Sequence, residues 1–394
     1  MKKRIAIIHG PMITGGTGKA LINLFHYMDF SKYDVTLWLN NDEGELIPQV
    51  DPRVKIRYYG DELAFVYNKY FGLLWKKRKI FPVVQSLFFE MLYKICKKDK
   101  QHSPYYKMKS RLVRKREKYD VVVLYQALPF SLLNIALGLF QSPHYIAWIH
   151  GDHIDPPTQQ EIAEYLALYK EYHEIVFVSE AVKKIHAARY PQLQEKFRVI
   201  YNLQDLSSIR KLAQEPLDVP FERSTLVTVG RLAPEKGQDM VPEIARNLLD
   251  IGYRFTWYLV GDGPTRPMIE NLIRQYHVED TVILTGTKSN PYPCIKNCTL
   301  YVQPSYHEGF CVTTFEAKIL GTPVVVTDVP GMREQFTDET ACFAEPTVVS
   351  LTAAIVKALE DPNKYRTQDA VTENFNFQEL QKIYQLLDEP VSQV

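Results

Sequence analysis

The sequence predicts an α/β protein with two doubly wound domains that face each other across a cleft. Short β-branched runs alternate with helix-length segments from one end of the chain to the other, which is the pattern of parallel sheets with crossover helices. The chain has 394 residues, more than the roughly 250 to 300 at which a single core usually stops growing. Two domains are therefore expected, with ligands held where loops meet at the carboxyl ends of the strands.

Seven strands are expected in the first half of the chain and six in the second. The first set covers residues 4–10, 34–40, 54–60, 120–126, 145–151, 174–179 and 197–202. The second set covers residues 225–231, 255–261, 281–286, 300–305, 323–328 and 341–346.

The stretch 206–225 is polar and contains proline, so it marks the boundary between the two domains. We expect an N-terminal Rossmann-like domain over residues 1–205 and a C-terminal one over residues 206–372. An amphipathic run, "NFQELQKIYQLL", predicts a last helix. It lies within residues 373–394, which are expected to pack back towards the N-terminal domain.

Composition indicates a globular protein of a reducing compartment. Hydrophobic residues make up 46% and charged residues 24%, which is ordinary for soluble proteins. The five cysteines form no C-x-x-C pair, so neither a disulfide framework nor a zinc site is indicated. The opening "MKKRIAII" is too short for a signal-peptide core, and no uncharged stretch approaches the ~20 residues that span a bilayer. A cytoplasmic protein is expected, at most peripheral on the inner face of the plasma membrane.

The opening segment "IAIIHGPMITGGTGKAL" resembles a P-loop but fails its defining positions. The P-loop pattern G-x-x-x-x-G-K-[ST] needs a first glycine and a metal-binding hydroxyl. Ile13 stands where that glycine belongs, and Ala20 replaces the hydroxyl residue. What remains is a strand, a loop with Gly15, Gly16 and Gly18, and a helix start. Such a loop can still approach an anion closely.

The segment "VGRLAPEKGQD" brings two cations into one loop after a strand. Arg231 supplies a planar fork suited to phosphate oxygens, and Lys236 a compact point charge. Together they can neutralise a diphosphate without a metal ion. The alternative is a solvated surface pair with no ligand.

The strongest signal lies in "PSYHEGFCVTTFEAKILGTPVVVTD", residues 304–328, which holds Glu308 and Glu316. "SYHEGF" reads as a loop and "VTTFEAKIL" as a short helix, so Glu308 precedes the helix and Glu316 lies about one turn inside it. Backbone amides at a helix start point outward without helical partners. Here they belong to Gly309, Phe310, Cys311 and Val312. Carboxylates beside free amides can bind a polyol and a phosphate together, although Glu308 alone could merely cap the helix.

The two glutamates, with "EGF" at the start and "GTPVV" at the end, resemble the E-x7-E motif of the retaining glycosyltransferases of family 4. The resemblance includes glycosyltransferases of bacterial cell-surface polysaccharides, and it covers most of the second half of the chain. Its further segments, in order, are "VSEAVKK", "VIYNLQD", "VGRLAPEKG", "LVGDGP", "GTKSNPYPCIKNCTLYVQPS" and "VPGMREQ". It implies the GT-B fold, in which two Rossmann-like domains face each other.

The resemblance also implies roles for residues on both sides of the cleft. Arg231 and Lys236 would grip the diphosphate of a nucleotide sugar, and Glu316 would bind the ribose hydroxyls. Glu308 would hold hydroxyls of the donor sugar, assisted by the amides from Gly309 to Val312. Gly16 would let the first domain's backbone approach the donor phosphate, so the anion expected at the glycine loop is the diphosphate of the nucleotide sugar.

Three further positions match the family pattern. His150 in "AWIHGD" corresponds to a histidine near the sugar and the acceptor hydroxyl, although a lone histidine after a strand is more often structural. The loop "GTKSNPY" lies where the family frames the base with backbone groups, which makes Lys288 and Asn290 candidate donor-site residues. Asp262 in "GDGP" is better explained as a turn residue.

Retention of the anomeric configuration is implied by the family only. The chain contains no Asp-x-Asp motif, so neither a metal nor another cofactor is expected, and family habit favours uridine in the donor. The two carboxylates of a retaining glycosidase lie ~5 Å apart on either side of the bond, and Glu308 and Glu316 are not spaced for that. A same-face route, in which the diphosphate accepts the acceptor's proton, is the mechanism we expect.

A basic, aromatic insert at about residues 65–118 departs from a minimal first domain. Between Lys69 and Lys118 sixteen Lys or Arg residues stand against three acidic ones. Such mixtures occur in helices that lie at membrane interfaces, where anionic lipid adds about 1 kcal/mol per basic residue. This favours a lipid-linked saccharide acceptor. The alternative is a solvated helical hairpin, and nucleic acid is disfavoured because no reader motif accompanies the charge.

Two other functions stay open. One is a catalytically silent glycosyltransferase-like subunit that positions an active partner, although the four charged positions of the site are all present. The other is an enzyme with a soluble acceptor. Whether the basic insert binds lipid would distinguish this function from transfer to a lipid-linked acceptor.

Overall fold

The computed structural model describes residues 2–13, 15–59, 117–127, 130–151, 157–221, 224–366 and 371–389. Almost all of the predicted basic insert, up to residue 116, lies outside these residues.

The first domain is built on a seven-stranded parallel sheet with the order β3-β2-β1-β5-β7-β8-β9. Its strands are β1 (Lys3–Ile8), β2 (Tyr33–Leu39), β3 (Lys55–Tyr58), β5 (Val121–Leu124), β7 (His144–Ile149), β8 (Glu174–Phe177) and β9 (Phe197–Val199). Its helices are α1 (Gly16–Tyr27), α6 (Phe130–Leu139), α7 (Gln159–Tyr169) and α8 (Glu180–Arg189).

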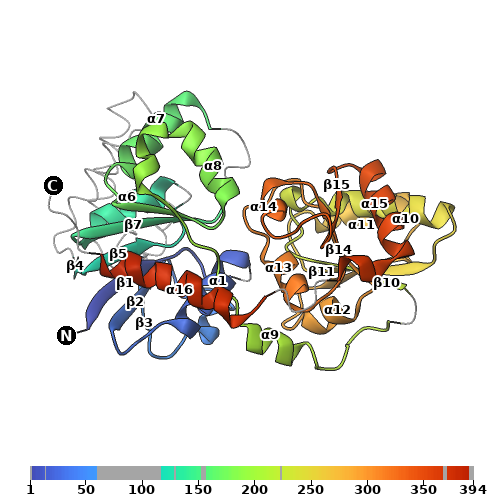
Figure 1. Cartoon of the computed structure of the whole chain (residues 1–394), viewed down its shortest axis with the longest axis horizontal. Helices are drawn as coiled ribbons and strands as arrows, with labels where there is room; N and C mark the ends of the chain where they lie inside the picture. The colour runs from blue at the N-terminus through green and yellow to red at the C-terminus, as the bar shows by residue number, and fades with distance from the viewer. Residues whose placement is uncertain are drawn as a thin grey trace, which may run out of the picture.

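The second domain is built on a six-stranded parallel sheet with the order β12-β11-β10-β13-β14-β15. Its strands are β10 (Ser224–Val229), β11 (Phe255–Val260), β12 (Val282–Gly286), β13 (Leu300–Gln303), β14 (Val324–Thr327) and β15 (Cys342–Ala344). Its helices are α10 (Val241–Asp250), α11 (Arg266–Gln275), α12 (Tyr292–Asn297), α13 (Val312–Ile319), α14 (Pro330–Arg333) and α15 (Val348–Glu360). Figure 1 shows the two sheets in separate lobes.

All thirteen predicted strands are present in these two sheets. One further pair, β4 (Glu117–Lys118) and β6 (Phe140–Gln141), was not predicted. Each of its strands has two residues, too few for an alternating pattern to register. Along the chain between β9 and β10, α9 (Leu206–Leu212) occupies part of the polar stretch that was expected to be the domain boundary.

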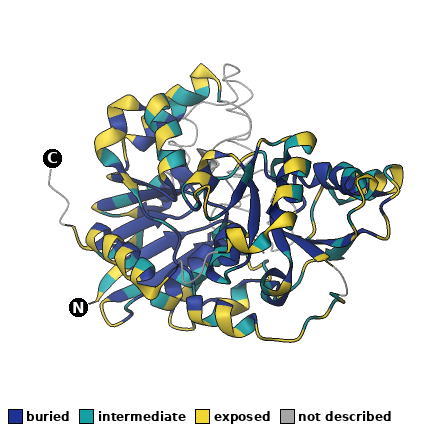
Figure 2. Cartoon of the chain, turned by 45° about the vertical axis from the view of Figure 1, so that its right-hand side comes forward, coloured by how far each residue is buried: buried dark blue, intermediate teal, exposed yellow. Residues whose placement is uncertain are grey.

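Each sheet is covered on both faces, which explains its continuous apolar strands. Successive strand residues point to opposite faces, and the core clusters divide accordingly. Ile5 and Ile7 of β1 join one cluster and Ala6 and Ile8 the other. Figure 2 shows the strands buried in the interior and the exposed sides of the helices facing outward.

The last helix, α16 (Glu373–Asp388), lies against the first domain beside α1 (Figure 1). Ile383, Leu386 and Leu387 are buried in the same apolar cluster as β1 and α1. The Tyr384 hydroxyl accepts a hydrogen bond from the Asp29 amide at 3.0 Å. The chain therefore crosses back from the second domain and ties its final helix to the first.

A glutamate of the second domain caps a helix of the first. Ser179 caps α8 through the Val182 amide at 3.1 Å. The Glu334 carboxylate, just after α14, accepts hydrogen bonds from the Glu180 amide at 2.8 Å and from the Ala181 amide. These are amides that a helix start leaves without partners, and a carboxylate there also complements the helix dipole.

The four cysteines in the described part of the chain are free and buried. Over the same residues, no helix has the length and apolar character needed to cross a bilayer.

Replacing Glu334 with Ala should loosen the start of α8. We expect a loss of about 1–2 kcal/mol, the usual cost of removing a helix cap and its charge-assisted bonds. Hydrogen exchange measured over residues 178–189 should become faster. Glu180→Ala is the matched control, because it removes a charge from the same helix end without removing these bonds. Equal exchange in the two variants would contradict the capping role.

Candidate functional site

The loop after β10 is held against the end of β13 by backbone contacts. Gly237 has φ 67°, and a side-chain carbon there would lie 2.1 Å from the Pro304 carbonyl oxygen, so only glycine fits. The carbonyl oxygen of Glu235 accepts hydrogen bonds from the amides of Tyr306 at 2.9 Å and His307 at 3.3 Å. Two loops that begin about 70 residues apart are thus joined at the carboxyl edge of the second sheet.

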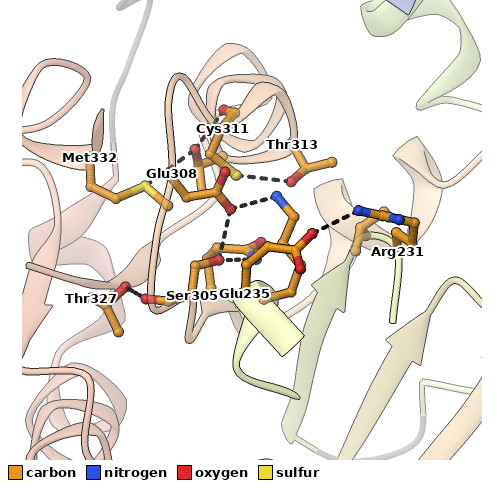
Figure 3. Close-up of polar contacts among 12 residues, drawn as sticks. Arg231, Glu235, Ser305, Glu308, Cys311, Thr313, Thr327 and Met332 are labelled. Atoms are coloured by element: carbon orange, nitrogen blue, oxygen red, sulfur yellow. Dashed lines mark hydrogen bonds and ion pairs between the residues drawn. The ribbon is translucent and has the colours of Figure 1, made fainter. Parts of the chain in front are cut away.

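This arrangement pairs Lys236 with Glu308. The Lys236 ammonium lies 2.7 Å from Glu308 Oε1, which also accepts a hydrogen bond from the Ser305 hydroxyl at 2.7 Å. Figure 3 shows the Glu308 carboxylate at the centre of these contacts. Burial alone would lower the pKa of Lys236, but the charge of Glu308 and the hydrogen bond to it raise the pKa above its ordinary value. Lys236 is therefore a fixed cation.

Arg231 comes from the same loop but is far more accessible. Its guanidinium lies 2.8 Å from Glu235 Oε1, and its side chain is 59% exposed, against 22% for Lys236. Figure 3 shows it reaching towards Glu235. Because a surface pair of this kind is weak, the guanidinium is free to exchange Glu235 for a stronger anionic partner.

The segment between Glu308 and α13 presents unused backbone donors. Within the described residues, the amides of Gly309, Phe310 and Cys311 donate no hydrogen bond. Burial raises the pKa of the Cys311 thiol to about 11, so this residue stays neutral beside them. Together with Val312 at the first position of α13, these amides form a row that can accept an anion.

Two contacts bring the first domain to this row. A side-chain carbon on Gly309 would lie 2.6 Å from the His150 carbonyl oxygen and 3.2 Å from Cα of Gly151, so the two backbones touch. A side-chain carbon on Gly16, at the start of α1, would lie 3.5 Å from a methyl carbon of Val312. The glycine loop of the first domain therefore faces the start of α13.

His150 follows β7 and is held neutral. Burial lowers the pKa of His150 to about 3, although a backbone hydrogen bond at Tyr125 opposes this. Its Nε2 atom is buried and has no hydrogen-bond partner in the described structure. His9, after β1, has the same property, and burial lowers its pKa to about 4. At neutral pH each ring can donate or accept a hydrogen bond but carries no charge.

Glu316 lies in the second turn of α13 and is buried. Its Oε1 atom accepts a hydrogen bond from the Tyr292 hydroxyl at 3.1 Å and lies 3.8 Å from the ammonium of Lys19. Its Oε2 atom is buried without a partner in the part of the chain described. A buried carboxylate oxygen without a donor is costly, so this atom is suited to a ligand hydroxyl.

Two predicted donor-site side chains are directed elsewhere. The Lys288 ammonium bonds to the Asp218 carboxylate. The Asn290 amide group donates to the Leu212 carbonyl at 3.0 Å and to Glu215 at 2.8 Å. Both side chains tie the loop after β12 to the stretch between the domains, because that stretch supplies the acceptors.

Sequence patterns brought out most of this group but missed three contributors. Lys19 was considered only as a P-loop lysine, Ser305 was not singled out, and Tyr292 stood in a motif quoted without a role. Each acts by touching Glu308 or Glu316. Within the described residues, no cluster of three or more His, Cys, Asp or Glu side chains is arranged to hold a metal ion.

The chain has two α/β domains with parallel sheets, and charged loops at the strand edge of the second domain face the glycine loop of the first. This arrangement is that of the GT-B class. Solved structures agree. HepE of Anabaena, crystallised with UDP and glucose, aligns with a TM-score of 0.69 at 19% identity, over 98% of this chain and 99% of that one. The predicted GT-B fold is confirmed.

Residues 210–374 match the family model described as glycosyl transferases group 1. An uncharacterized glycosyltransferase of Methanocaldococcus jannaschii is 25% identical over 51% of this chain and 52% of its own length. A 4-α-N-acetylgalactosaminyltransferase of Campylobacter jejuni, whose name specifies a diphospho-undecaprenol acceptor, is 30% identical over 37% of this chain and 39% of its own. These relatives match over about half of their length or less. Residues 210–374 thus resemble the group 1 glycosyltransferases, and the whole chain has the GT-B fold.

Replacing Gly309 with Ala should separate the two domains at the site. The added carbon would clash with the His150 backbone at 2.6 Å, and backbone cannot swing away. A displacement of about 1 Å in an active site costs on the order of a hundredfold in rate, and we expect a loss of that order in turnover. Gly151→Ala is the matched control, because an added carbon there meets nothing within 4 Å. Equal rates in both variants would rule out the contact as a constraint.

Proposed function

We propose that the chain is a retaining glycosyltransferase that moves a sugar from a UDP-sugar to a lipid-linked saccharide. The observation that carries the proposal is the Lys236–Glu308 pair beside the unused amides of residues 309–311. This observation brings together a fixed cation, carboxylate oxygens that can accept hydrogen bonds from hydroxyls, and backbone amides that can donate hydrogen bonds to an anion.

The departing diphosphate is the group that most needs stabilisation. Its charge grows as the bond to the sugar breaks, and preorganised donors aimed at developing charge are commonly the largest catalytic effect. We assign Lys236, Arg231 and the amides before α13 to this anion, with Gly16 admitting it from the other side. These groups supply the positive charge without a metal ion, so the reaction is proposed to be metal-independent.

The two glutamates have different tasks in this proposal. Glu308 has one oxygen held by Lys236 and Ser305, which leaves the other to hold donor-sugar hydroxyls. Glu316 offers its unpartnered Oε2 to a ribose hydroxyl. His150, held neutral beside Gly309, is assigned to a hydroxyl of the sugar.

Retention fits this arrangement best through a same-face route. A carboxylate nucleophile needs an ionised oxygen at the anomeric carbon, whereas in this proposal the second oxygen of each glutamate binds a hydroxyl of the donor. The leaving diphosphate is therefore proposed to take the proton of the acceptor hydroxyl on the face that it leaves.

The donor is tested with the purified chain and a panel of nucleotide sugars. A ligand at a hundred times its dissociation constant adds ~2.7 kcal/mol to stability, so the true donor should raise the melting temperature. Slow release of the free nucleotide, measured with and without EDTA, then distinguishes an enzyme from a silent subunit. No shift with any nucleotide sugar would overturn the proposed function.

Arg231→Ala and Lys236→Ala should each lower turnover at least a hundredfold, the usual effect of losing one such donor, ~3 kcal/mol. Arg246→Ala is the matched control for Arg231, because it breaks another i,i+4 pair with an acid, on α10 away from the site. Lys236→Ala leaves the partly buried Glu308 carboxylate without its cation, so the double variant with Glu308→Gln shows whether the loss reflects folding. Turnover near that of the native chain in Arg231→Ala would refute the diphosphate assignment.

The lipid-linked acceptor is supported by the composition of the insert and by the acceptor in the name of the Campylobacter relative. The chain should sediment with vesicles of anionic phospholipid, and 0.5 M salt should release it, because screening at that ionic strength reduces electrostatic attraction. Vesicles of neutral lipid are the control. Indifference to both lipid charge and salt would favour a soluble acceptor.

A further inference from the structure

Glu316 is the point where the first domain reaches into the proposed donor site. The two oxygens of its carboxylate have different surroundings. Oε1 has the Tyr292 hydroxyl at 3.1 Å and the Lys19 ammonium at 3.8 Å. Oε2 is buried and has no partner in the described part of the chain.

Lys19 belongs to the first turn of α1, in the first domain, whereas Glu316 and Tyr292 belong to the second. The Lys19 ammonium also lies 5.6 Å from the centre of the Tyr292 ring. A cation at that distance is attracted to the ring. Lys19 is therefore held on one side of the carboxylate by two independent attractions that cross between the domains.

The position of Lys19 decides which oxygen is left for a ligand. A buried carboxylate needs nearby charge and donors to stay ionised. Lys19 and Tyr292 both serve Oε1, so they fix the rotation of the carboxylate and leave Oε2 facing no donor of the protein. A hydroxyl can donate only to an oxygen with a free lone pair.

We propose that Lys19 is a positioning residue for nucleoside recognition, which it serves through Glu316. It holds Oε2 ready to accept from a ribose hydroxyl, so the ribose site is complete only when α1 lies against α13. This inference rests on the proposed function, because it needs a nucleotide donor. It gives the lysine of "GGTGK" a task unlike that of a P-loop lysine, which contacts phosphate.

The test measures UDP binding by calorimetry in the full-length chain. Lys19→Met should weaken UDP about tenfold, and Lys19→Arg should recover most of the loss. In turnover, Lys19→Met should raise the donor KM by a similar factor with little change in kcat. The control is Lys32→Met, because Lys32 also lies near an acid and a tyrosine ring, but outside the site. It lies 3.9 Å from Asp29 and 5.8 Å from the centre of the Tyr384 ring.

Two comparisons separate action through Glu316 from contact with phosphate. Residues that act together show non-additive effects, so Lys19→Met should cost little more once Glu316→Gln is present. The Lys19→Met variant should also bind 2′,3′-dideoxy-UDP, which lacks the ribose hydroxyls, as tightly as the native chain does. A loss that persists with the dideoxy nucleotide, or in the Glu316→Gln background, would assign Lys19 to the diphosphate and overturn the inference.

The outcome also separates this inference from the proposed function. If the native chain binds UDP and Lys19→Met binds it equally well, the positioning role is wrong and the proposed function stands. If the native chain binds no nucleotide or nucleotide sugar, the proposed function fails, and the inference fails with it.

Discussion

The site depends on one partly buried ion pair, between Lys236 and Glu308. Removing two charges from water costs several kcal/mol for each ion, and a well-packed apolar pair is often as stable. The pair is therefore poorly explained by stability alone. It joins the loop after β10 to the loop after β13, and it fixes a cation next to backbone amides that have no partner among the described residues. A polar ligand that binds there finds its counter-charge already in place.

Backbone contacts decide whether that pair meets the first domain. Gly237 lets one loop touch Pro304, and Gly309 lets the next touch His150, each at a distance that no side chain permits. Glu334 adds a cap on α8, and Phe310 and Phe315 join the apolar cluster of the first sheet. The two domains are therefore joined through the residues that surround the proposed donor site, so the position of one domain affects ligand binding on the other.

Local pattern was sufficient for the fold and for part of the site. Short β-branched runs that alternate with helix-length segments located every strand of the two large sheets. The change from "SYHEGF" to "VTTFEAKIL" located the start of α13 at Val312. Side-chain contacts between residues distant in the sequence could not be predicted from the sequence. Lys288 and Asn290 were assigned from their loop, but the acids and carbonyls of residues 212–218 hold both side chains. Lys19 and Glu316 lie almost 300 positions apart, and no periodicity records such a pair.

The glutamates show how neighbouring charges select one chemistry over another. A carboxylate that must attack a sugar has to be free and close to the anomeric carbon. Glu308 and Glu316 each have an oxygen engaged by a lysine and by a hydroxyl. The nearby histidine is neutral, so it cannot serve as a cation for the leaving group. In the proposed reaction Lys236 and Arg231 are therefore assigned to the departing charge, and the departing diphosphate is assigned as the base for the incoming hydroxyl. The constraint on the reaction therefore follows from which atoms the protein has already bound to one another.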